Sequence, residues 1–124
     1  MQVVIVEPKK KPTVQNIDDG LEAMQKIVGG TIQAIYPFEE PIALICNDEG
    51  KLIGLPQNRP LKHPETGEAY DVIYGTFFVC SAPADSENFK SLSDEQIEKY
   101  SKVFALPKLV CTDCGEEFPK DELY

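Results

Sequence analysis

The stretch TIQAIYPFEEPIALICNDEGKLI, residues 31–53, decides the fold, because it contains apolar runs separated by turn-forming residues. Residues 31–36 and 41–46 are rich in β-branched and apolar side chains, which is typical of strands. A proline-containing turn joins these two runs, and the turn 47–50 leads into a further short strand at 51–53. The stretch therefore predicts a three-strand antiparallel meander.

Further strand signals lie on both sides of the meander. Residues 3–6 (VVIV) form an unbroken β-branched run, and residues 13–17 return after a lysine-rich turn, which predicts a hairpin. Residues 71–81 (DVIYGTFFVCS) predict another buried strand, in which Gly75 marks a bulge or a close backbone approach. The seventeen residues 54–70 contain three prolines and predict a long irregular loop, and loops of that length are usually functional or mobile.

Two segments carry helix signals. Asp19 has the position of an N-cap, and the apolar spacing that follows predicts a helix over about 20–28 that stops at a double glycine. Ser93 and Gln96 have the spacing of a capping box, so a second helix begins there and ends before Pro107. On its exposed side the four-residue spacing predicts two ion pairs, Glu95–Lys99 and Glu98–Lys102.

Together these signals predict an α+β fold. We expect one small, mainly antiparallel sheet of about five to six strands, packed with two helices. Residues 1–106 form a single domain in this interpretation, and residues 107–124 form a C-terminal tail with a CxxC knuckle. Cys46 and Cys80 lie inside apolar strand runs, where a free cysteine behaves as a small hydrophobic residue.

Charge and hydropathy limit the function classes. The 124 residues carry 12 basic and 21 acidic side chains, a formal net charge of −9. This charge opposes a nucleic-acid backbone, so general nucleic-acid binding is not expected. The longest apolar runs are far below the eighteen residues of a membrane span, and the N-terminus does not have the charge order of a secretory signal. We therefore expect a cytoplasmic protein without membrane contact.

The tail contains Cys111-Thr112-Asp113-Cys114-Gly115, a CxxCG knuckle of the kind that holds half of a structural zinc site. No second CxxC follows to complete four ligands. The pair Cys111 and Cys114 therefore either contributes to a zinc site with more distant ligands, or stays a reduced pair in the tail. A redox role is disfavoured, because the neighbouring acidic residues raise a thiol pKa.

The sequence contains few residues in recognisable catalytic patterns, and we expect a protein that is not an enzyme. The sequence contains no phosphate-binding loop, no nucleophile elbow and no zinc-protease motif. The only histidine, His63, has no partner that the sequence identifies as its catalytic neighbour.

The candidate ligand site is the segment GLPQNRPLKH, residues 54–63, which holds the only arginine and the only histidine of the chain. A guanidinium offers a planar set of donors suited to phosphate or carboxylate, and aromatic side chains beside it would suit a nucleotide-like anion. The alternative is that this arginine and the asparagine before it bond backbone carbonyls and hold the loop in place. The candidate ligand-binding residues are Arg59, Asn58, Lys62, His63, Tyr36, Phe38 and Tyr74.

Several longer motifs accompany that loop motif, over roughly residues 1–104. They are Glu7-Pro8, the helix 21–30 with its double glycine, Ile35-Tyr36-Pro37-Phe38, Cys46-Asn47-Asp48-Glu49-Gly50, Gly54-Leu55-Pro56-Gln57-Asn58-Arg59 and Gly75-Thr76-Phe77-Phe78. With these motifs the chain resembles domain-of-unknown-function family 3846, small proteins of phages and mobile elements of Gram-positive bacteria. The resemblance implies a setting in which such proteins act against host defence, and it carries no mechanism.

Two functional hypotheses follow. The first is a non-enzymatic, homo-oligomeric binding protein that sequesters a small anionic, nucleotide-derived immune signal through the 54–63 loop. The second is an acidic protein-interaction module, a nucleic-acid mimic or adaptor that inhibits a basic host defence protein, in which Arg59 only holds its loop.

Overall fold

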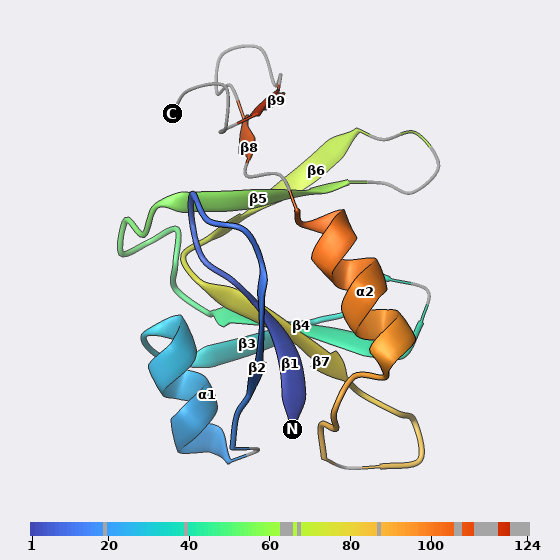
Figure 1. Cartoon of the computed structure of the whole chain (residues 1–124). Helices are drawn as coiled ribbons and strands as arrows, with labels where there is room; N and C mark the ends of the chain where they lie inside the picture. Colours follow the sequence, from blue (N-terminus) through green and yellow to red (C-terminus); the bar gives the residue numbers. More distant parts are fainter. Residues whose placement is uncertain are drawn as a thin grey trace.

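The computed structural model describes residues 1–105 except positions 19, 39, 63–65, 67 and 87, together with the backbone of 108–110 and 117–119. For Lys62 and Tyr70 it describes the backbone alone. The elements follow one another along the chain as shown in Figure 1: β1 (Gln2–Val6), β2 (Thr13–Asn16), α1 (Leu21–Val28), β3 (Ile32–Ile35), β4 (Ile42–Asn47), β5 (Gln57–Lys62), β6 (Ala69–Tyr74), β7 (Phe77–Ser81), α2 (Asp94–Val103), β8 (Lys108–Val110) and β9 (Glu117–Pro119).

A five-stranded antiparallel sheet with strand order β2-β1-β7-β4-β3 forms the centre of the fold. The hairpins β1–β2 and β3–β4 were both expected from the sequence, and β7 lies between them as the central strand. Strands β5 and β6 pair in a separate two-stranded sheet, and so do β8 and β9. The α+β class is confirmed, but the strands are divided among separate sheets.

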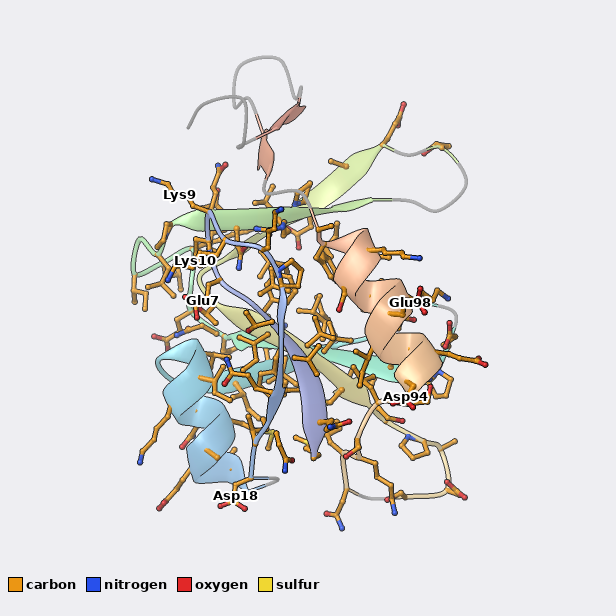
Figure 2. All side chains as sticks on the ribbon, viewed as in Figure 1. Glu7, Lys9, Lys10, Asp18, Asp94 and Glu98 are labelled. Carbon is orange, nitrogen blue, oxygen red and sulfur yellow. The ribbon has the colours of Figure 1, made fainter. Side chains whose placement is uncertain are left out.

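The central strands are buried on both faces, which explains their continuous apolar sequences. One face carries Val3, Ile5 and Phe78 and packs against α1. The other face carries Val4 and Phe77 and packs against α2 and the β5–β6 hairpin. The two helices therefore cover opposite faces of the sheet, and side chains fill the space between them (Figures 1 and 2). Cys46 and Cys80 are buried in β4 and β7, as the sequence predicts.

Helix α1 has nearly the predicted bounds, but it begins differently. Its N-cap is Gly20, which provides no side-chain hydrogen bond, so the prediction of Asp19 as the cap is wrong; Asp19 itself lies outside the described residues. The helix ends as expected at Gly29, whose φ of 79° is left-handed and suits glycine.

Helix α2 begins with the predicted capping box, in which Ser93 and Gln96 exchange side-chain and backbone hydrogen bonds. Lys102 pairs with Glu98 as predicted, at 3.0 Å. Lys99 pairs instead with Glu40, so the Glu95–Lys99 prediction is wrong. The long-range pair lowers the pKa of Glu40, since its carboxylate accepts a hydrogen bond from the Lys99 ammonium. At 8 and 10 residues, α1 and α2 are far shorter than the roughly 20 residues of a membrane-spanning helix, and no other helix occurs among the described residues.

Two predictions for the middle of the chain are wrong. Residues 51–53 form part of a turn, so the meander has two strands and not three. Residues 54–70 do not form one irregular loop, because 57–62 and 69–74 pair as β5 and β6. Pro60 is tolerated in β5 because that strand has a single partner and the ladder contains register shifts on both sides of the proline.

The predicted strand 71–81 is divided at Gly75. The residues before it belong to β6 and the residues after it to β7, in different sheets. Gly75 has a φ of 83°, which only glycine adopts readily, and a Cβ atom there would lie 2.6 Å from Cδ1 of Leu55. The backbone N–H of Gly75 also donates to the carbonyl oxygen of Pro56 at 2.7 Å, so a close backbone approach is present here. The left-handed conformation of Gly75 turns the chain from one sheet to the other.

Candidate functional site

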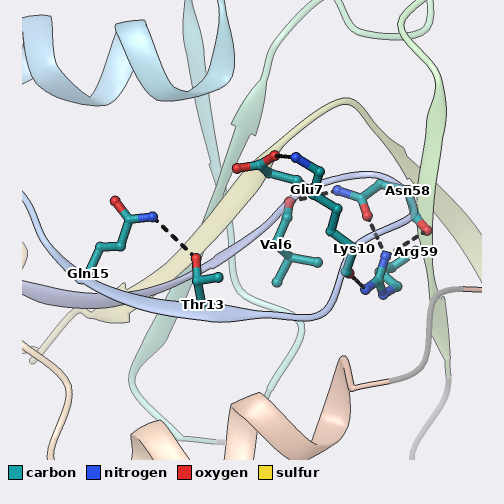
Figure 3. Close-up of polar contacts among 7 residues, drawn as sticks. All are labelled: Val6, Glu7, Lys10, Thr13, Gln15, Asn58 and Arg59. Carbon is teal, nitrogen blue, oxygen red and sulfur yellow. Dashed lines mark hydrogen bonds and ion pairs between the residues drawn. The ribbon is translucent and has the colours of Figure 1, made fainter.

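Arg59 lies inside the protein, where its residue exposure is 2%. Nε and Nη2 donate hydrogen bonds to the carbonyl oxygen of Phe104 at 3.2 and 3.1 Å, and Nη2 also donates to the carbonyl oxygen of Lys10. Nη1 donates to Oδ1 of Asn58 at 2.7 Å (Figure 3). Phe104 is the C-cap of α2, so the guanidinium also lies at the negative end of the helix dipole.

Asn58, the residue before Arg59, also bonds the main chain of other segments. It is 1% exposed, and its Nδ2 donates to the carbonyl oxygens of Val6 and Gly75, each at 2.8 Å. The two adjacent side chains of β5 thus join the end of β1, the β1–β2 turn, the β6–β7 connection and the end of α2. We call this arrangement the Asn58–Arg59 joint.

The joint corresponds to the alternative in which both residues bond backbone carbonyls. Its polar atoms are directed at oxygens of the chain itself, and neither side chain has an exposed surface to offer a ligand. The expectation that Arg59 lines an open pocket is therefore wrong for this structure. Burial of a guanidinium is costly unless its donors are satisfied, and several backbone oxygens satisfy them here.

The other predicted ligand residues are dispersed. Tyr36 is 62% exposed, whereas Phe38 packs its ring against those of Tyr100 and Phe104. Tyr74 accepts a hydrogen bond from Gln57 Nε2 at 3.2 Å. His63 and the side chain of Lys62 lie outside the described residues.

A surface cleft of about 350 Å³ lies between the five-stranded sheet and the β5–β6 hairpin. Strands β3 and β4 and the turn after β4 form one wall, and β6 forms the other. The lining side chains that carry its polar chemistry are Gln33, Asp48, Glu49, Lys51, Asp71 and Tyr74. Apart from Tyr74 these residues were not among the sequence candidates.

The cleft contains an ammonium group that belongs to the chain itself. Lys51 Nζ donates to Oδ1 of Asp71 at 2.6 Å and lies 5.8 Å from the centre of the Tyr74 ring. The hydrogen bond to Asp71 raises the pKa of Lys51. Three acidic residues line the cleft, Asp48, Glu49 and Asp71, against one lysine, so its described lining residues carry a formal net charge of −2.

The turn that carries Asp48 and Glu49 is held by Asn47, which is 6% exposed. Its Nδ2 donates to the carbonyl oxygen of Val28 at 3.2 Å, and its Oδ1 accepts from the backbone N–H of Glu49 at 2.8 Å. The end of α1 therefore fixes the position of the turn, and the acidic side of the cleft is a defined part of the fold.

Gly50 lets the turn approach β6 closely. A Cβ atom at this position would lie 2.8 Å from the carbonyl oxygen of Tyr74, a backbone atom that cannot rotate away. We expect Gly50→Ala to destabilise the protein by about 1–3 kcal/mol, because the two walls must separate. Gly20→Ala is the control, since nothing lies within 4 Å there and its φ is −77°. Urea unfolding measures the unfolding free energies of both variants. Equal losses of stability would contradict the close approach of Gly50 to the backbone of Tyr74.

Among the described residues that line the cleft, Cys46 carries the thiol, and a raised pKa makes that thiol a poor nucleophile at neutral pH. Burial, followed by the charges of Asp48 and Asp71, raises its pKa to about 11. At pH 8 about one thiol in a thousand is then ionised, so alkylation should be at least about 100-fold slower than in the urea-unfolded chain. Mass spectrometry of the peptide containing Cys46 after timed iodoacetamide treatment checks this. Labelling at the unfolded rate would show that the thiol is accessible.

Within the residues that the structure describes, no three His, Cys, Asp or Glu side chains come together as a metal site. Cys111 and Cys114 of the predicted zinc knuckle lie outside them. The zinc prediction therefore stays a prediction.

Fold and cleft together define a small α+β protein with an acidic hollow between a five-stranded sheet and a β-hairpin. The chain belongs to the family described as a domain of unknown function, DUF3846, whose match covers residues 1–105. Neither the curated proteins nor the solved structures include a match. The family description assigns no activity.

Proposed function

We propose that this chain is a non-enzymatic protein-interaction module whose acidic cleft binds a cationic side chain of a partner protein. The observation that carries the proposal is the position of Lys51, whose ammonium lies between the Asp71 carboxylate and the Tyr74 ring. A carboxylate and an aromatic face are the groups that bind ammonium and guanidinium ions in proteins. A partner's lysine or arginine would find the same groups by displacing Lys51.

Charge supports the same class of partner. The net charge of −9 and the excess of carboxylates in the cleft attract a basic surface and speed its association at low salt. The Lys51–Asp71 pair is about half exposed, so its opening costs little free energy.

An anionic ligand has less support. The arginine that would have recognised a phosphate is buried in the Asn58–Arg59 joint, and the cleft has the same charge sign as a phosphate. We therefore propose the second of the two hypotheses, an adaptor that engages a basic host protein. The setting proposed for it is the infected host cell, as the resemblance to phage and mobile-element proteins suggests.

The test uses a short lysine-rich peptide, its fully acetylated form and a panel of cyclic and linear nucleotides, each titrated by calorimetry. We expect the lysine peptide to bind, the binding to weaken with salt, and both the acetylated peptide and the nucleotides to give no heat. Nucleotide binding without peptide binding would reject the proposal and restore the anionic ligand.

Removal of the Asp71 charge should weaken peptide binding. We expect Asp71→Asn to reduce the affinity about ten- to one-hundredfold, because one charge-assisted contact is lost. Asp85→Asn removes the same charge at an exposed position outside the cleft and should change the affinity less than threefold. Equal effects of the two substitutions would show that only the overall charge matters.

Removal of Lys51 should have the opposite effect. We expect Lys51→Ala to strengthen binding about three- to tenfold, because the internal competitor for Asp71 and Tyr74 is gone. Lys26→Ala removes an exposed lysine of α1 and serves as the matched control. Weaker binding after Lys51→Ala would mean that Lys51 holds the cleft open instead of occupying it.

A further inference from the structure

We propose that the partner segment binds as an added β-strand along the outer edge of β3. This inference rests on the proposed function, because the same cleft receives the basic side chains of the added strand. Strand β3 is an end strand of the five-stranded sheet and pairs only with β4 among the described residues. The outer edge of such a strand presents N–H and C=O groups that can pair with an extended peptide.

The ladder shows which backbone groups face outward. The backbone N–H of Asp48 donates to the carbonyl oxygen of Thr31, so Thr31 and Asp48 form a hydrogen-bonded pair. In an antiparallel ladder this bonding alternates, and the register continues with Gln33 opposite Cys46. Gln33 and Ile35 therefore turn their backbone groups to β4, whereas Ile32 and Ala34 turn theirs to the outer edge.

The same alternation places the side chains. Gln33 and Ile35 line the cleft, and Ile32 and Ala34 pack on the α1 side of the sheet. A strand added to the edge would likewise direct alternate side chains to the cleft face. Basic residues at every second position would then face the cleft, and those at the Thr31 end of β3 would lie beside the acidic turn that carries Asp48 and Glu49.

Charge decides between possible occupants of this edge. A second copy of the chain, paired through its own β3, would bring a second cleft of net charge −2 beside the first, and like charges oppose that contact. An extended segment with alternating lysines carries the complementary charge. We therefore infer a partner whose binding segment is extended and basic on one side, with apolar or neutral residues between the lysines.

The experiment uses a nine-residue peptide of alternating lysine and valine and two versions with N-methylated backbone amides, one at the odd and one at the even positions. N-methylation removes a donor and adds bulk without changing the charge. If the peptide adds to β3, one version should lose at least tenfold in affinity, and the other, whose methyl groups point away from the edge, should bind within about threefold of the parent.

Ala34→Pro tests the edge from the side of the protein. Proline removes an N–H that faces outward and leaves the β3–β4 ladder intact, so the variant should keep its circular dichroism spectrum and lose at least tenfold in peptide affinity. If Ala34→Pro does not fold, the affinities of the two N-methylated peptides for the unaltered protein test strand addition instead.

The outcomes separate the two proposals. If the parent peptide does not bind, both the proposed function and the proposal of strand addition at β3 are rejected. Binding that depends on Asp71 but is equally tolerant of both N-methylated versions would overturn strand addition and leave the cationic cleft partner in place. A dimer that forms through β3 and is disrupted by Ala34→Pro, in the absence of peptide, would identify a second copy as the occupant and contradict this inference.

Discussion

Replacement of Arg59 by alanine should cost about 3–5 kcal/mol of unfolding free energy, a large part of the roughly 5–15 kcal/mol that stabilises a protein of this size. Arg59 is 2% exposed, and loss of its guanidinium would leave the carbonyl oxygens of Phe104 and Lys10 and Oδ1 of Asn58 without these donors. A cavity would remain beside them. Chemical unfolding followed by circular dichroism measures the change.

Lys10→Ala is the matched control for this prediction. Lys10 contributes its backbone oxygen to the joint, whereas its side chain points to Glu7 at the surface, with an exposure of 70%. The substitution keeps the acceptor and removes only an exposed ion pair, so the expected cost is below about 1 kcal/mol. If Arg59→Ala were as stable as Lys10→Ala, the joint would not hold the fold, and a surface role for Arg59 would have to be reconsidered.

Replacement of Tyr100 by alanine is the second large effect, with an expected loss of about 3–5 kcal/mol. Tyr100 is fully buried on α2, and its ring packs against Phe38 with centroids 4.6 Å apart. Its removal opens a cavity between α2 and the sheet.

Tyr100→Phe separates the contribution of the ring from that of the hydroxyl. The buried hydroxyl oxygen of Tyr100 lies near the Glu40–Lys99 pair, but among the described residues no group meets the distance and angle of a hydrogen bond to it. Burial is the largest cause that raises the pKa of the phenol. We therefore expect the unfolding free energy of Tyr100→Phe to lie within about 1 kcal/mol of that of the unaltered protein, since the substitution removes a polar atom that makes no hydrogen bond. A loss as large as that of Tyr100→Ala would reveal a hydrogen bond that the structure does not show.

The parts of the fold that the sequence predicts well are those specified by local chemistry. The capping box at Ser93 and Gln96 specifies the start of α2 from two neighbouring side chains. The apolar runs of β1, β4 and β7 indicate burial because each strand is covered on both faces. The Gly29 stop of α1 follows from a single backbone conformation.

The errors arise where distant parts of the chain determine the result. The prolines predict an irregular loop over 54–70, but residues 57–62 form β5, which pairs with β6. Strand β5 tolerates Pro60 because the ladder is irregular on both sides of it. Arg59 looks exposed because arginine usually is, and its acceptors are carbonyl oxygens 49 and 45 residues away in sequence. The sequence analysis left open that Arg59 and Asn58 bond backbone carbonyls, as the structure shows. Backbone carbonyls leave no residue-type signal, so which carbonyls these side chains bond could not be predicted.

The cleft was missed for a related reason. Asp71 is twenty residues from Lys51, and the wall formed by β6 adjoins the turn 48–52 only because Gly75 turns the chain between the sheets. One signal was present in the sequence: the motif Cys46-Asn47-Asp48-Glu49-Gly50 contributes five adjacent residues to the cleft wall. Its acidic pair was interpreted as an ordinary turn, because the opposite wall could not be located.

The most direct test of the central claim is a backbone amide NMR titration of the protein with the lysine–valine peptide. A cationic ligand in the cleft should shift the amides of Asp48, Lys51, Asp71 and Tyr74 in a saturable way and leave those of Asn58 and Arg59 in place. Saturable shifts centred on Asn58 and Arg59, or no shifts at the cleft at a peptide concentration that binds by calorimetry, would contradict the account.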